Sequence, residues 1–221
     1  FYKLLKNNII KNAEAGEVDY KNKTVFADGK YFRYNNLIST QPLTRLINNL
    51  KNAPQHIIKS AEQLRHTSVR CINIGVRYKK EIPENIKGRH WIYIPEKKYP
   101  FYRVGIYSNV SSKLAPKNGY CLYVEFSGRD NVFLNCEDTI KHLIALGFIG
   151  IDDEILTANI LDMPYAYVIF DKNRQKALNV INKFLNSYNI YSIGRYGAWE
   201  YSFIEKNITD AKKLADKLNY K

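Results

Sequence analysis

The first part of the chain carries short runs of β-branched and aromatic residues separated by turn residues, a pattern typical of strands. Asp28-Gly29 lies between two of these runs and is a strong signal for a tight hairpin turn. A later apolar run ends at a polar turn and Pro42, as a buried strand does where it meets a loop and a helix. Strands are predicted over residues 18–20, 23–26, 31–34 and 37–40, and helices over 43–50 and 54–64.

The middle of the chain is rich in aromatic and β-branched runs with prolines and glycines between them, which favours an antiparallel sheet. From Glu137 the apolar spacing changes to that of a helix, which ends near Gly147. Asp171 is a suitable first residue for another helix. The predicted strands are residues 69–78, 91–94, 102–107, 120–126, 155–161, 165–170 and 190–193.

The last segment is amphipathic with a helical period. Its apolar residues alternate steps of four and three, which predicts one apolar seam lying on a core. The seam consists of Ile204, Ile208, Ala211, Ala215 and Leu218. Together these patterns predict an α+β fold, a mixed and largely antiparallel sheet with flanking helices.

Composition adds limits to this picture. With 221 residues, of which 45% are hydrophobic, the chain can bury one sizeable core or two small ones. No apolar run approaches the roughly 20 residues that span a bilayer. Three widely spaced cysteines are typical of reduced residues in a cytoplasmic protein, and none has the close Cys or His partner of a metal site. A Gly-x-Ser-x-Gly elbow, an HExxH motif and a P-loop are all absent from the sequence.

The net charge of +13 attracts anions, which include nucleic acids, membrane surfaces and nucleotide ligands. Lys and Arg are scattered along the chain and do not form one stripe, which argues against a dedicated nucleic-acid module. A non-enzymatic basic module that binds nucleic acid or another polyanion nevertheless stays open as the alternative function.

The segment Ser-Ile-Gly-Arg-Tyr-Gly-Ala-Trp-Glu-Tyr-Ser, residues 192–202, carries the most specific chemistry. It reads as a strand end, a glycine turn and the start of a helix. Gly194 and Gly197 lack Cβ, so the backbone there can approach a flat ligand or a phosphate. The following helix would direct its N-terminal amides at the same turn. An ordinary turn with core aromatics explains the same residues equally well.

A resemblance to a known family favours a ligand-binding turn over an ordinary one. The stretch GRYGAWEYSFIEKNITDAKKLADKL resembles the closing segment of FAD-dependent enzymes of the amine oxidase and protoporphyrinogen oxidase group, including UDP-galactopyranose mutases. Residues 18–47 are similar to that family's return to its FAD domain, and residues 91–116 to strands of its substrate domain. The family's N-terminal GxGxxG segment is missing here. The resemblance therefore implies the C-terminal part of a longer flavoprotein, a fragment that alone does not retain FAD.

The resemblance also implies site residues. The glycine turn would contact the flavin, with amides from about Ala198 to Tyr201 stabilising negative charge on it. Arg103 would face the pyrophosphate of an anionic substrate, with Tyr102 beside it, and Tyr201 would bind a substrate phosphate. Trp199 replaces the tyrosine that the mutases carry, which leaves the choice between oxidoreductase and mutase open. The implied cofactor residues are Gly194, Arg195, Tyr196, Gly197, Trp199, Glu200 and Tyr201.

The implied domain organisation has three parts. Residues 1–41 and 190–221 would belong to an incomplete FAD-binding domain, and residues 42–189 would form the substrate domain. The implied partners are the missing N-terminal half and an anionic small molecule such as a nucleotide sugar from polysaccharide synthesis. Neither the resemblance nor the residues assign a catalytic side chain.

Overall fold

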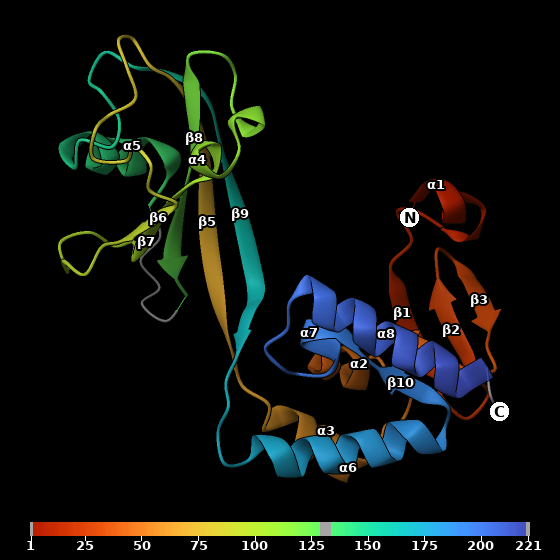
Figure 1. Cartoon of the computed structure of the whole chain (residues 1–221). Coiled ribbons are helices and arrows are strands. Elements are labelled where there is room, and N and C mark those ends of the chain that lie inside the picture. The colour runs from red at the N-terminus through yellow and green to blue at the C-terminus, as the bar shows by residue number, and fades with distance from the viewer. Residues whose placement is uncertain (1, 129–133, 220–221) are drawn as a thin grey trace. The chain divides into compact units, whose positions relative to one another are not determined.

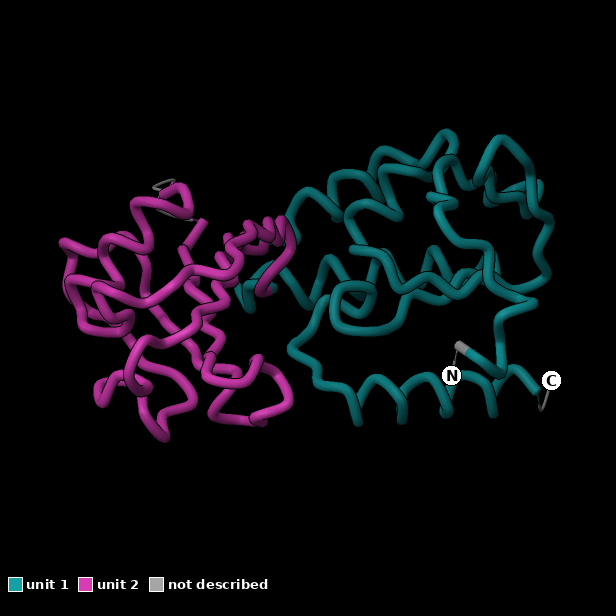
Figure 2. The backbone as a smooth tube through the Cα atoms, turned by 90° about the horizontal axis from the view of Figure 1, so that it is seen from above, with its two compact units in different colours: residues 1–65, 168–221 teal, residues 66–167 magenta. Residues whose placement is uncertain are grey.

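The computed structural model describes residues 2–128 and 134–219. The chain forms two compact units, shown in teal and magenta in Figure 2. Unit 1 consists of residues 1–65 and 168–221, and unit 2 of residues 66–167. In the described part of the chain, no helix combines the length and the apolar character needed to cross a membrane.

Unit 1 begins with two short helical turns and a three-stranded antiparallel sheet (Figure 1). Asp28 and Gly29 have φ values of 49° and 71°, so both central residues of the β2–β3 turn are left-handed, as a type I′ hairpin requires. The predicted hairpin is confirmed. The elements are α1 (Tyr2–Leu5), η1 (Lys6–Asn8), β1 (Ala15–Asp19), β2 (Thr24–Ala27) and β3 (Lys30–Arg33).

The rest of unit 1 is a two-stranded parallel sheet with helices. β4 (Leu37–Ser39) pairs with β10 (Ile190–Ser192), although they are far apart in sequence. α3 (Gln55–Glu62) packs along α6 (Arg174–Ser187), as Figure 1 shows, and both bury their apolar faces. The remaining helices are α2 (Leu43–Asn48), α7 (Gly194–Gly197) and α8 (Ile204–Asn219).

Unit 2 is a five-stranded sheet in the order β6-β7-β8-β5-β9. Burial alternates strictly along the central strand β8, so one face of the sheet lies on a core and the other is partly open. The strands are β5 (His66–Arg77), β6 (Trp91–Tyr93), β7 (Arg103–Ile106), β8 (Gly119–Ser127) and β9 (Glu154–Val168). The helical segments are α4 (Tyr107–Val110), η2 (Ser112–Leu114) and α5 (Cys136–Ala145).

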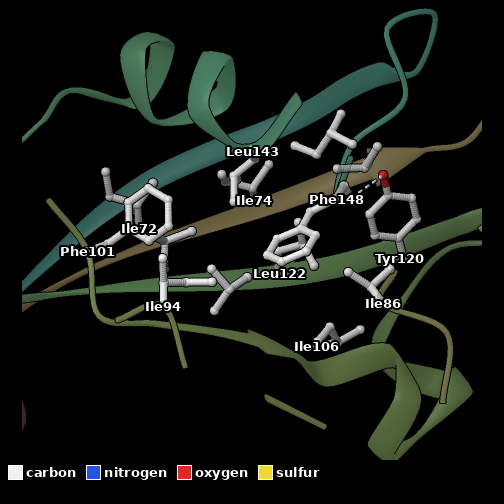
Figure 3. Close-up of a cluster of buried hydrophobic side chains, with 14 of the residues drawn as sticks. Ile72, Ile74, Ile86, Ile94, Phe101, Ile106, Tyr120, Leu122, Leu143 and Phe148 are labelled. Atoms are coloured by element: carbon white, nitrogen blue, oxygen red, sulfur yellow. Dashed lines mark hydrogen bonds between the residues drawn. The ribbon is translucent and has the colours of Figure 1, made fainter. Parts of the chain in front are cut away.

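The core of unit 2 lies between one face of this sheet and α5 (Figure 3). Ile74 and Leu122 from the sheet pack with Leu143 of α5 and with Phe148. The hydroxyl of Tyr120 donates to the carbonyl oxygen of Phe148 at 3.2 Å, so this buried polar group is satisfied. This face of the sheet is therefore occupied by the core of unit 2.

The α+β class with a mixed, largely antiparallel sheet is confirmed, but the prediction of two strands around Met163-Pro164 is wrong. Residues 154–168 form one strand, β9, that runs through Pro164. β9 lies at the edge of its sheet, where proline's missing N–H needs no strand partner.

The unit boundaries differ from the domain boundaries expected at 41/42 and 189/190. Both expected boundaries fall inside unit 1, because α2, α3 and α6 pack with one another and with β10. Unit 2 is therefore shorter than the expected substrate domain.

The last helix also differs from expectation. α8 begins at Ile204 and not directly after the glycine turn, and none of its described residues is buried. Ile204 is 80% exposed and Ile208 is 55% exposed. The apolar seam predicted to lie on a core is therefore open in this chain.

Candidate functional site

The glycine turn of unit 1 follows β10 and forms the single helical turn α7. Ile193 ties the turn to the parallel sheet, because its N–H donates to the carbonyl oxygen of Ser39 at 3.0 Å. Gly194 has φ +82°, and a Cβ built on it would meet no heavy atom within 4 Å. The backbone face of Gly194 is thus open.

Gly197 has a different role. A Cβ at this position would lie 3.0 Å from Ser192 Oγ and 3.2 Å from the carbonyl oxygen of Ser39. Glycine here allows the turn to pack closely on β10 and β4. The two glycines of the motif therefore divide between an open surface and a packing contact.

The expectation that amides from Ala198 to Tyr201 point at a ligand is wrong for two of them. The N–H of Ala198 donates to Gly194 at 2.8 Å, and that of Glu200 to Arg195 at 3.0 Å. The physical reason is that α7 is an isolated turn, whose following amides close onto its own carbonyl groups.

Trp199 is fully buried in unit 1, with φ +54°. Its carbonyl oxygen accepts hydrogen bonds from both Nε and Nη2 of Arg174, the first at 2.8 Å. The guanidinium of Arg174 lies 4.1 Å from the ring centre of Phe170, which stacks on Tyr201 at 5.0 Å. Trp199 thus anchors the turn from inside, while Phe170 and Tyr201 offer exposed aromatic rings.

The charged residues of the motif make contacts within the same segment. Nη1 of Arg195 donates to the carbonyl oxygen of Ser202 at 3.0 Å, and its guanidinium carbon lies 5.8 Å and 5.9 Å from the rings of Tyr196 and Tyr201. Glu200 pairs with Lys206 at 2.7 Å. These contacts hold the segment between α7 and α8 in one conformation.

The open face of the unit 2 sheet carries a continuous row of side chains across four strands. The register places Tyr93 of β6 beside Arg103 of β7, Arg103 beside Glu125 of β8, and Glu125 beside Cys71 of β5. Directly paired residues in antiparallel strands point to the same face. We call Tyr93, Arg103, Glu125 and Cys71 the Arg103 row.

Glu125 is the centre of this row. Its Oε2 accepts from Arg103 Nε at 2.8 Å and from the Tyr102 hydroxyl at 2.6 Å, and Arg103 Nη2 lies 2.6 Å from it. The side chains of Arg103 and Glu125 are only 20% and 12% exposed. The hydrogen bond to Glu125 raises the pKa of Arg103, and the Tyr93 and Tyr167 side chains also hydrogen-bond to Arg103. Glu125 is thus an ion-paired residue of a central strand.

The ionisable neighbours of Glu125 are held protonated. Burial, followed by the hydrogen bond to Glu125, raises the pKa of the Tyr102 hydroxyl far above its usual range. Burial, followed by the charge of Glu125, raises the pKa of the Cys71 thiol to about 11. At neutral pH the guanidinium of Arg103 is therefore held charged, and the phenol of Tyr102 and the thiol of Cys71 are neutral donors beside Glu125.

The raised pKa of Cys71 predicts a loss of stability at alkaline pH. An acid whose pKa rises on folding opposes folding once pH passes its unfolded value near 9, until pH reaches its folded value near 11. We expect the unfolding free energy to fall by about 2 kcal/mol more in the native chain than in Cys71→Ala over this interval. Urea unfolding at a series of pH values measures the difference, and parallel curves for the two proteins would contradict it.

The sequence-predicted residues thus lie in two groups. Those from Gly194 to Tyr201 belong to unit 1, and Tyr102 and Arg103 to unit 2. Sequence reasoning missed Tyr93 and Cys71 of the Arg103 row. It also missed that Tyr102 and Arg103 share Glu125 as a hydrogen-bond acceptor. Alternation along each strand could have placed these side chains on one face, but the register between strands carries no short sequence signal.

The fold is that of the C-terminal part of the flavin-dependent oxidoreductase and mutase group, and the resemblance stated from the sequence is confirmed. A reduced UDP-galactopyranose mutase matches with a TM-score of 0.77 and 27% identity, over 90% of this chain and 45% of that one. No family model matches the sequence.

Two further solved structures share the fold. One, from Exiguobacterium sp. 255-15 and assigned as a protoporphyrinogen oxidase, has a TM-score of 0.72 and 12% identity over 93% of this chain and 46% of that one. A putrescine oxidase variant with redesigned cofactor binding has a TM-score of 0.67 and 16% identity over 99% of this chain and 50% of that one. The chain spans about half the length of the structures it matches.

Proposed function

We propose that this chain is the C-terminal part of a flavin-dependent oxidoreductase or mutase that acts on a nucleotide sugar or a related polysaccharide precursor. The observation that carries the proposal is the match to reduced UDP-galactopyranose mutase over 90% of the chain. When bound, FAD would supply the hydride or electron-pair chemistry, and the protein would supply binding and electrostatics.

Apolar surface left exposed in unit 1 supports the proposal that a further half of the protein covers it. A parallel sheet is normally covered on both faces, yet the two-stranded sheet of β4 and β10 leaves Ile38 exposed. The open seam of α8 is a second such surface. We propose that the N-terminal, FAD-binding half of the protein covers these surfaces.

Unit 1 would supply one wall of the flavin site. The open backbone of Gly194 would lie against the ring, and Arg195 and Tyr201 would line the same wall. Tyr196, Trp199 and Glu200 would support it, since Trp199 is buried and Glu200 is paired with Lys206. Because this chain contributes only that wall, we do not expect it to retain FAD by itself.

Unit 2 would present the substrate face. Arg103 commits Nε and Nη2 to Glu125 and also contacts Tyr93 and Tyr167, so its guanidinium would meet a substrate oxygen beside the exposed side chain of Tyr93. Tyr102 would contribute by donating a hydrogen bond to Glu125 and so holding its carboxylate in place. A guanidinium held in this way suits a phosphate oxygen of an anionic substrate.

Gly194→Ala in the full-length protein tests the cofactor wall. We expect the bound-FAD content to fall about tenfold or more, since the new methyl group would occupy the open face that the ring needs. Gly29→Ala is the matched control, because Gly29 also has positive φ and open space around an added Cβ, but lies in the β2–β3 hairpin. The absorbance of purified protein measures bound flavin.

Equal loss of FAD in both variants would contradict the role of Gly194. A full-length protein that takes up no FAD, but binds RNA with strong salt dependence, would overturn the proposed function in favour of the polyanion-binding alternative.

A further inference from the structure

A surface turn of unit 2 lies between η2 and the start of β8. It consists of residues 116–119, and the N–H of Gly119 closes it by donating to the carbonyl oxygen of Pro116 at 3.0 Å. Asn118 has φ +57° at the third position of the turn, where type II turns need glycine or asparagine. Asn118-Gly119 is the only Asn-Gly pair in the sequence. We call residues 116–119 the Asn118 turn.

An asparagine followed by glycine can modify itself. The backbone nitrogen of Gly119 attacks Cγ of the Asn118 side chain, so that a new C–N bond forms and the side-chain nitrogen leaves as ammonia. Water then opens the resulting succinimide ring, which yields aspartate or isoaspartate at position 118. The reaction needs only water, and glycine favours it because no Cβ shields the attacking nitrogen.

The reacting side chain is accessible, and the turn lies where the sheet opens most easily. Asn118 is exposed, and its carboxamide makes no hydrogen bond to the residues that the structure describes. Gly119 pairs with Arg77, and this is the last pair in the register of β5 and β8. Backbone pairing at the end of a ladder opens at a lower free-energy cost than pairing in its centre.

The closed turn opposes the reaction in two ways. The attacking nitrogen of Gly119 is engaged with Pro116, and the carbonyl oxygen of Asn118 accepts from the N–H of Tyr78 at 3.0 Å. Closing the succinimide ring also rotates the peptide between Asn118 and Gly119 out of its place in the turn. The turn must therefore open first, and the reaction rate follows the population of the open form.

We propose that Asn118 is a site of spontaneous deamidation whose rate is set by opening of the Asn118 turn. Isoaspartate, one of the two products, carries an extra methylene group in the main chain. The turn has no room for it, since even a Cβ on Gly119 would lie 2.8 Å from Pro116 Cγ and 2.8 Å from the carbonyl oxygen of Val76. The modified turn therefore does not close again on the end of β5.

Incubation of the 221-residue chain at mildly alkaline pH, followed by peptide mass spectrometry, tests the site. Asn12 and Asn52 are matched internal controls, because both are exposed and have φ values of 56° and 52°, but each precedes alanine. We expect Asn118 to deamidate faster than either control. In urea-unfolded chain Asn118 should react about tenfold faster or more, since the turn is then open throughout.

A pair of proline variants tests control by the turn. We expect Pro116→Ala to speed deamidation of the folded chain about two- to fivefold, because alanine gives the open turn more conformational freedom than proline. Pro95→Ala is the matched control, since Pro95 is also an exposed proline of unit 2 but lies outside the Asn118 turn. In urea the native chain and both variants should react at the same rate.

Three results would overturn the proposal: deamidation of Asn118 no faster than that of Asn12 and Asn52, equal rates for Asn118 in folded and unfolded chain, or equal rates in Pro116→Ala and Pro95→Ala under folding conditions. The reaction requires neither flavin nor substrate. A full-length protein that takes up no FAD would therefore contradict the proposed function and leave this inference unchanged.

Discussion

Replacing Glu125 with alanine is expected to lower the unfolding free energy of the chain by about 2–4 kcal/mol. The change leaves the guanidinium of Arg103 and the hydroxyl of Tyr102 without their shared acceptor in a largely buried place. Leaving a charge unpaired in such a place destabilises the fold by far more than the intact ion pair stabilises it. Urea unfolding followed by circular dichroism measures the difference.

Glu154→Ala is the matched control for this result. Glu154 also pairs with an arginine across the unit 2 sheet, Arg77, at 2.5 Å, but the two side chains are 60% and 50% exposed. Exposed pairs contribute about 0–1 kcal/mol, so this variant should change stability little. Similar losses from Glu125→Ala and Glu154→Ala would contradict the role assigned to the Arg103 row.

Gly105→Ala is expected to destabilise unit 2 by about 1–3 kcal/mol. A Cβ on Gly105 would lie 1.9 Å from the ring of Tyr123, its neighbour across the strands, so the ring must move. Moving it breaks the contact between the rings of Tyr123 and Tyr107, whose centres lie 4.5 Å apart. The shift of the urea midpoint gives the size of the effect.

A double-mutant cycle shows whether the clash is the cause. Tyr123→Ala removes the ring, and in that background Gly105→Ala should be nearly neutral, because the backbone of Gly105 is not in the left-handed region. An equal loss of stability with and without the Tyr123 ring would mean that the clash is not the cause. The cycle thereby separates the steric role of Gly105 from any backbone preference.

Much of the fold follows from local sequence signals. Asp28-Gly29 specifies its hairpin through left-handed backbone at both residues, and the alternation along residues 120–126 specifies a strand with one buried face. Pro164 misled the prediction, since a proline reads as a strand break unless the strand is known to lie at an edge. Edge position depends on strand order, which is a property of the whole sheet.

The candidate site was predictable in part. The glycine turn and Arg103 could be singled out from sequence and resemblance, but their surroundings could not. Gly194 and Gly197 look alike in the sequence, yet one is open and the other is packed against Ser39. That distinction arises from β4, about 155 residues earlier in the chain, through parallel pairing with β10.

By itself, the sequence determined the elements, the hairpin, the alternation of buried and open faces, and the glycine turn, because these depend on local backbone preference and periodicity. Only the tertiary structure decided which residues meet. It placed Glu125 between Arg103 and Cys71, and it left the α8 seam exposed. The physical reason is that strand register and packing join residues distant in sequence, and no local pattern encodes those pairings.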